Sequence, residues 1–267
     1  MLLRHHPLTG CFSSKLLSTA YSAVNYSLVL ARGGLESIAM EVKRRTIKSY
    51  VIRQGRLTRG QQQALDRLWP VYGIDFKPGR LDLDTCFKRS APVILEIGFG
   101  NGDSLLQQAV SNPQNNYLGI EVHRPGVGHL LRLADDADIT NLRVINHDAV
   151  EVLRQQIPDH SLDCVQLFFP DPWHKKRHHK RRIVSAEFIR LVCEKLKPGG
   201  LFHLATDWQD YAERMLAEME QAEGFSNTAG KANYAENTGR PSTKFEHRGR
   251  LLGHGVWDLV FRKESVV

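Results

Sequence analysis

From Ala91 to Arg262 the sequence alternates short apolar runs with segments of helical periodicity. This alternation is typical of βαβ units, which build a mainly parallel sheet covered by helices. Strands are predicted at residues 93–97, 117–121, 143–146, 163–169, 201–206 and 256–262, and helices at 104–110, 127–134, 150–156, 183–196 and 209–222. The pattern therefore predicts one α/β domain over residues 91–267, with ligands binding at the carboxyl edge of its sheet.

The first 90 residues lack this alternation and are expected to form two parts. Residues 1–39 contain no acidic residue before Glu36 and include an uncharged, Ser-rich stretch, so they faintly resemble a signal or transit peptide. Polar residues dilute the apolar stretch, and Met40 begins a basic run that is a second plausible start. We therefore interpret residues 1–39 as a disordered, dispensable or wrongly assigned extension. Residues 40–90 are expected to form a basic arm with a short helix at 60–68 and a turn-rich connection.

Charge and cysteine spacing narrow the class of protein. The chain has 36 Lys and Arg against 29 Asp and Glu, and the surplus lies before residue 68 and after Trp173, which suits a phosphate backbone better than a membrane. The four cysteines lack metal-ligand spacing, so we expect reduced core thiols and no metal site. Because no apolar run reaches the roughly 18 residues of a spanning helix, a soluble, cytoplasmic protein is expected.

The segment from residue 168 to residue 182 carries the strongest functional signal. A predicted strand ends in Phe-Phe-Pro-Asp-Pro-Trp, and nine consecutive cationic or imidazole residues follow. Pro170 and Pro172 favour extended backbone around Asp171, which would hold that carboxylate at the edge of the sheet. A basic run alone is more often a solvated face or a targeting patch. Its position beside Asp171 favours an active site that acts on a polyanionic substrate.

Three glycines separate the first predicted strand from the first helix of the domain. Gly98, Gly100 and Gly102 allow a tight turn in which the backbone approaches a ligand closely, so Gly98 and Gly100 are candidate cofactor contacts. The GxGxG pattern differs from the GxGxxG of dinucleotide-binding folds. Glu96, at the end of the strand, would repel a diphosphate. A cationic ligand without phosphates fits this loop better.

Acidic residues end the next two predicted strands as well. Glu121 is placed to accept hydrogen bonds from both hydroxyls of a ribose, and Asp148 from an adenine amino group. Asp148 precedes a helix, so a simple capping role is equally plausible for it alone. Together with Glu96 and the glycines, these acids favour S-adenosylmethionine, whose sulfonium and amino groups suit an acidic pocket.

Six segments of the chain resemble successive motifs of the bacterial tRNA (guanine-N7-)-methyltransferase family (TrmB). They read LEIGFGNGDS, YLGIEVHRPGVG, NLRVINHDAVEVL, LFFPDPWHKKRHHKRRIV, FHLATDW and RPSTKFEHRGRLLGHGVWDLVF. The resemblance covers about residues 43–262, and FFPDPWHKKRHHKRR and TKFE are its most specific parts. It implies a class I (Rossmann-like), seven-stranded methyltransferase fold with an antiparallel last strand. The implied reaction is methyl transfer from S-adenosylmethionine to N7 of guanosine at position 46, in the tRNA variable loop.

The resemblance also implies roles for individual residues. Glu96, Glu121, Asp148 and Asp171 would line the cofactor pocket, and Asp171 would be catalytic. The substrate would contact Lys175, Asp207, Thr243, Lys244, Phe245 and Glu246. The RNA would contact Arg177, His178, His179, Lys180, Arg181 and Arg182.

The chemistry of guanine is compatible with these roles. N7 carries an in-plane lone pair and no proton, so its methylation needs alignment and electrostatics rather than a strong base. Asp171 is therefore expected to orient the substrate. Asp171, Asp207 and Glu246 all remain candidates to accept the N1 and N2 hydrogens of guanine. Trp173 and Phe245 are candidates for stacking on a base, although aromatic residues near glycines more often anchor loops.

Two other function classes remain open at this point. An NAD(P)-dependent oxidoreductase is disfavoured by the GxGxG pattern and by the lack of a Tyr-x-x-x-Lys pair. A noncatalytic RNA-binding protein would need the basic segments but not the acids at the strand ends. The expected partner is tRNA, and we expect a monomer or homodimer without an obligate protein partner.

Overall fold

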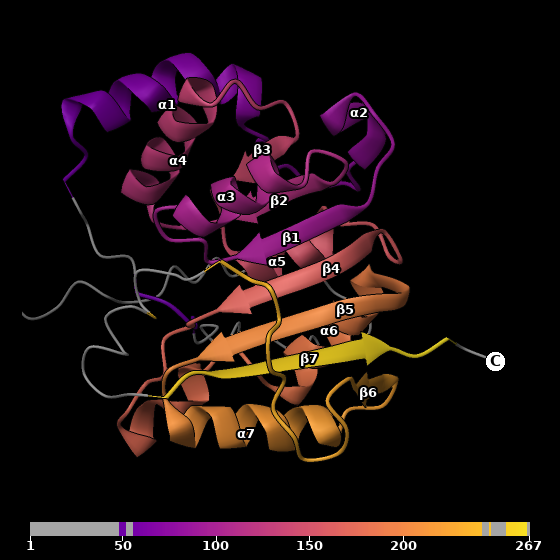
Figure 1. Cartoon of the computed structure of the whole chain (residues 1–267). Helices are drawn as coiled ribbons and strands as arrows, with labels where there is room; N and C mark the ends of the chain where they lie inside the picture. Colours follow the sequence, from indigo (N-terminus) through magenta and orange to yellow (C-terminus); the bar gives the residue numbers. More distant parts are fainter. Residues whose placement is uncertain (1–47, 52–55, 242–245, 247–254, 266–267) are drawn as a thin grey trace, which may run out of the picture. The chain divides into compact units, whose positions relative to one another are not determined.

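Seven strands form one sheet in the order β3-β2-β1-β4-β5-β7-β6 in the computed structural model (Figure 1). The strands are β1 (Val93–Ile97), β2 (Asn116–Ile120), β3 (Leu142–Ile145), β4 (Leu162–Phe168), β5 (Leu196–Thr206), β6 (Phe225–Asn227) and β7 (Trp257–Lys263). The first five pair in parallel, whereas β7 runs antiparallel to both β5 and β6. The expected class I arrangement with an antiparallel last strand is confirmed.

The structure describes residues 48–51, 56–241, 246 and 255–265, all within the unit Thr46–Val267. The interpretation of residues 1–39 and the predicted substrate contacts Thr243, Lys244 and Phe245 lie outside the described residues. Within the described ranges, no helix combines the length and the apolar character that a bilayer crossing requires.

Two apolar cores cover the two faces of the sheet. Alternate residues of β1 point to opposite faces, so Leu95 belongs to one core and Ile94 to the other. The core that contains Ile94 packs against α1 (Arg59–Tyr72), α3 (Asp103–Ser111) and α4 (Arg124–Asp136). The core that contains Leu95 packs against α2 (Leu83–Phe87), α5 (Ala149–Gln155), α6 (Ala186–Lys195) and α7 (Gln209–Glu220). The carboxyl ends of the parallel strands are thereby left to form a site.

The helix α1 extends four residues beyond its predicted end. It starts with a capping box, in which the side chains of Thr58 and Gln61 each accept a hydrogen bond from the other's backbone N–H. It continues through Pro70 to Tyr72, which is only 5% exposed. Burial of the Tyr72 ring offsets the free-energy cost of the backbone hydrogen bond that Pro70 cannot donate.

The boundary between α6 and β5 also differs from the prediction. Leu196 was expected to end a helix before a turn at residues 197–200, but it pairs with Leu162 as the first residue of β5. The side chain of Leu196 is fully buried, so packing outweighs the turn preference of the Pro-Gly-Gly sequence. A register shift between Leu162 and Cys164 accommodates the extra strand residues.

Candidate active site

A cavity of about 660 Å³ opens at the carboxyl ends of β1, β2 and β4. It lies where the strand order reverses between β1 and β4, the usual ligand position in an open α/β sheet. Its volume is in the ordinary range for small-molecule pockets. All the predicted cofactor contacts line it, namely Glu96, Gly98, Gly100, Glu121, Asp148 and Asp171.

The glycine loop between β1 and α3 has a backbone that other residues adopt only at a cost. Gly98, Gly100 and Gly102 have φ values of 73°, 61° and 82°. The start of α4 packs directly on this loop, because a Cβ added to Gly126 would lie 1.9 Å from the carbonyl oxygen of Gly100. The glycine loop is thus fixed between the start of α4 and the cavity.

Glu121 ties the glycine loop to the end of β2. Its Oε2 accepts a hydrogen bond from the backbone nitrogen of Gly100 at 2.9 Å. Its Oε1 accepts from the backbone nitrogens of Val122 at 2.6 Å and His123 at 2.9 Å. A carboxylate here therefore shapes the cavity as well as facing it.

Asp148 caps the helix α5 and also borders the cavity. Its Oδ1 accepts from the backbone nitrogen of Val150 at 3.0 Å, and its Oδ2 lies 3.7 Å from the Nζ of Lys48. The capping interpretation is confirmed. It does not exclude a ligand contact, since a carboxylate has several acceptor sites.

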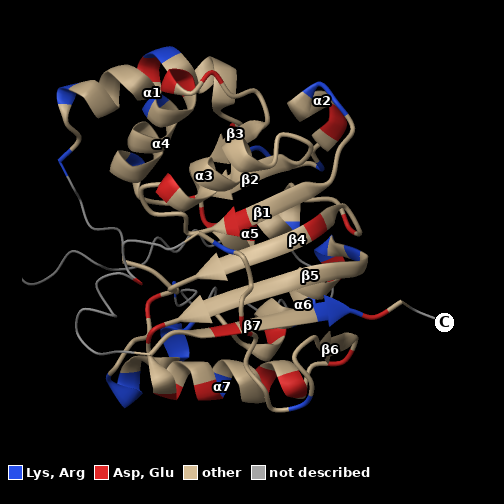
Figure 2. Ribbon diagram, viewed as in Figure 1, with Lys and Arg blue, Asp and Glu red and all other residues tan. Residues whose placement is uncertain are grey.

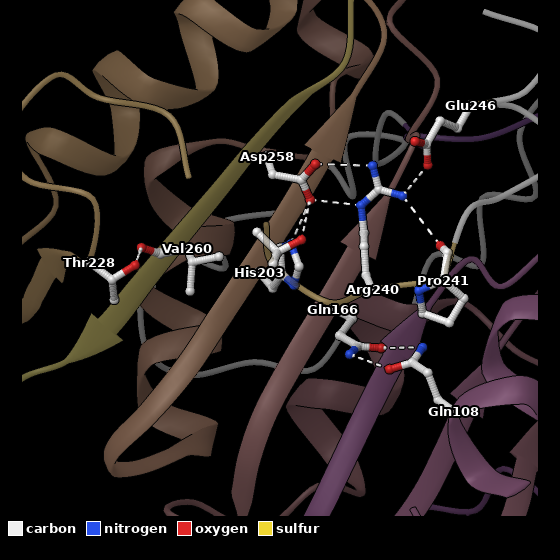
Figure 3. Close-up of polar contacts among 10 residues, drawn as sticks. Gln108, Gln166, His203, Thr228, Arg240, Pro241, Glu246, Asp258 and Val260 are labelled. Atoms are coloured by element: carbon white, nitrogen blue, oxygen red, sulfur yellow. Dashed lines mark hydrogen bonds and ion pairs between the residues drawn. The ribbon is translucent and has the colours of Figure 1, made fainter. Parts of the chain in front are cut away.

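Glu96 is a buried acid at the base of the cavity, with 3% of its surface exposed. Burial, with a further contribution from the negative charge of Glu121, raises the pKa of Glu96 to about 8. The Nε2 of Gln108 lies 3.4 Å from its Oε2, and the amides of Gln108 and Gln166 pair with each other at 3.1 and 2.8 Å (Figure 3). At pH 7 this acid is mainly protonated, and a cation in the cavity would favour its ionised form.

Asp171 lies at the exposed side of the cavity. Among the described residues, none makes a hydrogen bond or an ion pair with its carboxylate. The residues on either side of the Pro-Asp-Pro sequence have left-handed backbone, with φ values of 51° at Phe169 and 48° at Trp173. Such a conformation costs about 1–2 kcal/mol in a non-glycine residue. Strained backbone of this kind often occurs at functional sites.

The basic run after Trp173 forms a short 3₁₀ helix, η1 (Lys176–Arg181), beside the start of α7 (Figure 2). Lys175, Lys176, Arg177 and Lys180 are exposed. These side chains form the accessible cationic surface of the run.

Arg182 does not belong to that surface, because its side chain is 2% exposed. It donates to the carbonyl of Pro172 at 2.8 Å and to the carboxylate of Asp210 at 2.5 Å, and its guanidinium lies 4.7 Å from the ring centre of Tyr211. A guanidinium engaged in this way is not available to an RNA phosphate. Burial therefore removes Arg182 from the set of proposed RNA contacts.

A buried ionic network, which we call the Arg240 network, includes side chains of β5 and β7. The guanidinium of Arg240 donates to both oxygens of Asp258, at 2.7 and 3.0 Å, and to Glu246 (Figure 3). The Nε2 of His203 lies 2.7 Å from the same Asp258. Arg240 also lies 5.2 Å from the ring centre of Phe169, two residues before Asp171.

The predicted substrate contacts occupy different environments. Lys175 is exposed, Asp207 is half-buried just after β5, and Glu246 is 3% exposed within the Arg240 network. The sequence interpretation assigned no role to Arg240, although it lies in the RPSTKFEHRGR segment. It also missed Ser49 and Tyr50, which line the cavity.

Comparisons with known proteins agree with this geometry. Residues 90–259 match the family model Methyltransf_4, described as "Putative methyltransferase". The chain is 59% identical to a tRNA (guanine-N(7)-)-methyltransferase of Aeromonas hydrophila subsp. hydrophila, over 82% of this chain and 93% of that protein. It is 60% identical to the enzyme of the same name in Yersinia enterocolitica, over 83% of this chain and 93% of that protein.

A solved structure is similar to the chain in fold. The crystal structure of the 16S rRNA methyltransferase KamB superimposes with a TM-score of 0.53 and 15% sequence identity, covering 69% of this chain and 93% of that one. At this identity the likeness supports the class I methyltransferase fold.

Proposed function

The chain belongs to the tRNA (guanine-N(7)-)-methyltransferase family, and from this premise we propose how its residues carry out the reaction. It is an enzyme that transfers a methyl group from S-adenosylmethionine to N7 of a guanosine in tRNA. We propose that this guanosine is at position 46, in the variable loop. We further propose that the enzyme acts in the cytoplasm, as a monomer or homodimer without an obligate protein partner.

The cavity fits S-adenosylmethionine in size and charge. The loop at Gly98 and Gly100 lets main chain approach a ligand without side chains in between. Glu121 and Asp148 present carboxylates suited to ribose hydroxyls and an adenine amino group. Glu96 is the residue most responsive to a cationic ligand, because its raised pKa falls again when positive charge lies nearby.

Bound S-adenosylmethionine supplies an electrophilic methyl group, and the residues of the chain then have to bring guanine N7 to it. N7 needs no deprotonation, so alignment and charge stabilisation decide the rate. Asp171 lies at the exposed side of the same cavity, where an incoming base would meet it. Its carboxylate orients the guanine and stabilises the positive charge that the base acquires during transfer.

Recognition of guanine requires acceptors for its N1 and N2 hydrogens. Asp171, Asp207 and Glu246 are the candidate acceptors, and adenine offers no donors at the equivalent positions. Glu246 is held by Arg240, which donates a charge-assisted hydrogen bond to its Oε2 and fixes the position of that oxygen. We propose that Glu246 contributes to guanine recognition through this arrangement.

The accessible cations of the basic run are suited to the tRNA backbone. Lys175, Arg177 and Lys180 are exposed, follow Asp171 closely in the chain, and are proposed to contact phosphates. His178 and His179 are half-buried on the same short helix and are secondary candidates.

The observation that carries the proposal is the convergence of four acids and the glycine loop on one cavity next to the basic run. It is tested by incubating the protein with unmodified tRNA and labelled S-adenosylmethionine, then digesting the tRNA to nucleosides for mass spectrometry. We expect label in 7-methylguanosine alone. A tRNA with adenosine at position 46 should remain unlabelled. Label in another nucleoside, or unchanged labelling of the position-46 variant, would contradict the proposed specificity.

A further inference from the structure

Residues 48–51, here called the crossing segment, form part of the wall of the cavity. Ser49 and Tyr50 line it together with Asp148 and the glycine loop. The Nζ of Lys48 donates to the hydroxyl of Tyr50 at 2.8 Å and lies 3.7 Å from Asp148. A short piece of chain that precedes the whole sheet in sequence therefore borders the cofactor site.

Two side chains from the PDPW and basic segments hold the crossing segment in place. Arg181 donates from Nε to the carbonyl of Lys48 at 3.1 Å and from a terminal nitrogen to the carbonyl of Tyr50 at 2.9 Å. Between these, the indole nitrogen of Trp173 donates to the carbonyl of Ser49 at 3.1 Å. Three successive carbonyls of the crossing segment thus have donors from these two side chains.

Arg181 and Trp173 also contact each other. The guanidinium of Arg181 lies 4.1 Å from the ring centre of Trp173, within the range of a cation–π interaction. This stacking orients the guanidinium fork so that it bridges two carbonyls, which a flexible ammonium group would do less well. Arg181 therefore has a structural role in holding residues 48–51, unlike a cation that contacts only solvent.

Arg181 differs in this respect from its neighbours in the basic run. Lys180 and Arg177 are exposed, and no described main-chain carbonyl accepts from them. Arg181 is half-buried and directs two hydrogen bonds inward. Two of the five donors of Arg181 are thus engaged by carbonyls of its own chain and are not available to a phosphate.

We propose that Arg181, supported by Trp173, is a positioning residue for S-adenosylmethionine rather than primarily an RNA contact. It holds the crossing segment against the cavity, so cofactor affinity depends on a residue of the RNA-binding segment. This inference rests on the proposed use of the cavity as the cofactor site. Since the two binding events share η1, tRNA and cofactor affect each other's affinity by the same factor.

The test is calorimetric titration with S-adenosylmethionine, without tRNA, of the full-length protein and matched variants. We expect Arg181→Ala to weaken cofactor binding about tenfold, as expected for loss of charge-assisted hydrogen bonds. Arg181→Lys should bind nearly as weakly, because it keeps the charge but loses the fork. Lys180→Ala, the adjacent exposed control, should bind the cofactor like the wild type while its tRNA affinity falls.

A second pair of variants separates positioning from a general loss of structure. Tyr50→Ala removes part of the wall that Arg181 holds, so its effect on cofactor affinity should not add to that of Arg181→Ala. Additive effects would overturn the proposal, as would wild-type cofactor affinity in Arg181→Ala with weakened tRNA binding alone. Each variant is first checked for wild-type circular dichroism and thermal midpoint. If the wild type fails to bind S-adenosylmethionine, the proposed function falls together with this inference, whereas equal binding by wild type and Arg181→Ala refutes this inference alone.

Discussion

Glu246 is paired with Arg240 inside the protein, where 4% and 6% of the two side chains are exposed. The Glu246 carboxylate is therefore a buried, fixed group and not a freely rotating side chain at the surface. The direction of this carboxylate depends on Arg240, which is fixed in turn by Asp258 of β7. One guanidinium therefore contacts both a carboxylate of β7 and the carboxylate that we propose for guanine recognition.

Replacing Arg240 by methionine should be strongly destabilising. The change leaves the carboxylates of Asp258 and Glu246 buried without their cation, and breaking a buried ion pair costs about 3–5 kcal/mol. Urea denaturation measures the free energy of unfolding. Arg214→Met on α7 is the control, because its pair with Glu218 is exposed and contributes roughly 0.3–0.5 kcal/mol. Equal losses in both variants would show that the Arg240 network does not contribute as proposed.

Binding of S-adenosylmethionine should release protons from Glu96. Burial, and then the charge of Glu121, raise the pKa of Glu96 to about 8, so the free enzyme holds this proton at pH 7. A bound cation favours the ionised form, so the cofactor affinity should increase as the pH rises toward about 8 and then level off. Calorimetry in two buffers with different ionisation enthalpies counts the protons. In Glu96→Gln the release should vanish, and an unchanged proton count would exclude Glu96 as its source.

The double replacement Arg177→Ser and Lys180→Ser should weaken tRNA binding and flatten its dependence on salt. Each lost phosphate contact lowers the slope of log affinity against log salt by about 0.7–0.9. Titrations at several salt concentrations give this slope, and cofactor affinity should stay at the wild-type value. Arg132→Ser, an exposed position on α4, is the control. If the control and the double variant have the same slope, the basic run is only a solvated face.

Asp171→Asn should slow methyl transfer far more than it weakens tRNA binding. Asparagine keeps the size of the side chain but removes the negative charge that stabilises the methylated base. We expect a loss of about 100-fold or more, comparable to removal of one preorganised electrostatic group from an active site. Single-turnover rates at saturating tRNA and cofactor measure the chemical step. A wild-type rate would assign Asp171 a role other than catalysis.

The elements that border the cavity were largely predictable from the sequence. β1 occupies the predicted residues 93–97, and the ends of β2, β3 and β4 differ from prediction by one residue. The apolar runs of β1 and β2 are short and buried at every position, and they are followed by Gly98 and Glu121. Since parallel strands present their carboxyl ends at one edge, the convergence of Glu96, Glu121 and Asp148 followed from the pattern.

The pairing of the cations could not be predicted in the same way. Arg181 and Arg182 are neighbours in a uniformly basic run, yet one clamps residues 48–51 and the other is buried against Asp210. Their partners lie 131 and 28 residues away. Local sequence shows the charge of a side chain but not the carbonyl or carboxylate that tertiary packing brings to it.

The helix η1 was missed for a related reason. Its residues, Lys176–Arg181, have no apolar periodicity to mark a helix. The strand β6 and the short helix α2 were likewise not predicted. They have three and five residues respectively, which is too few to show a periodic pattern of apolar residues. Such short elements are stabilised by tertiary contacts rather than by a local sequence pattern.

The order of the strands has a consequence for how the protein is made. β7 follows β6 in the chain but is inserted between β5 and β6, and it is the strand to which both of them pair. While the polypeptide emerges from the ribosome, β5 must wait with one open hydrogen-bonding edge until β7 has been synthesised. Asp258 arrives on that same strand, so Arg240 lacks this carboxylate partner before then. The strands β1 to β5 can thus pair early in synthesis. The part of the sheet that carries Asp258, and through it positions Arg240 and Glu246, is completed only when β7 has been made.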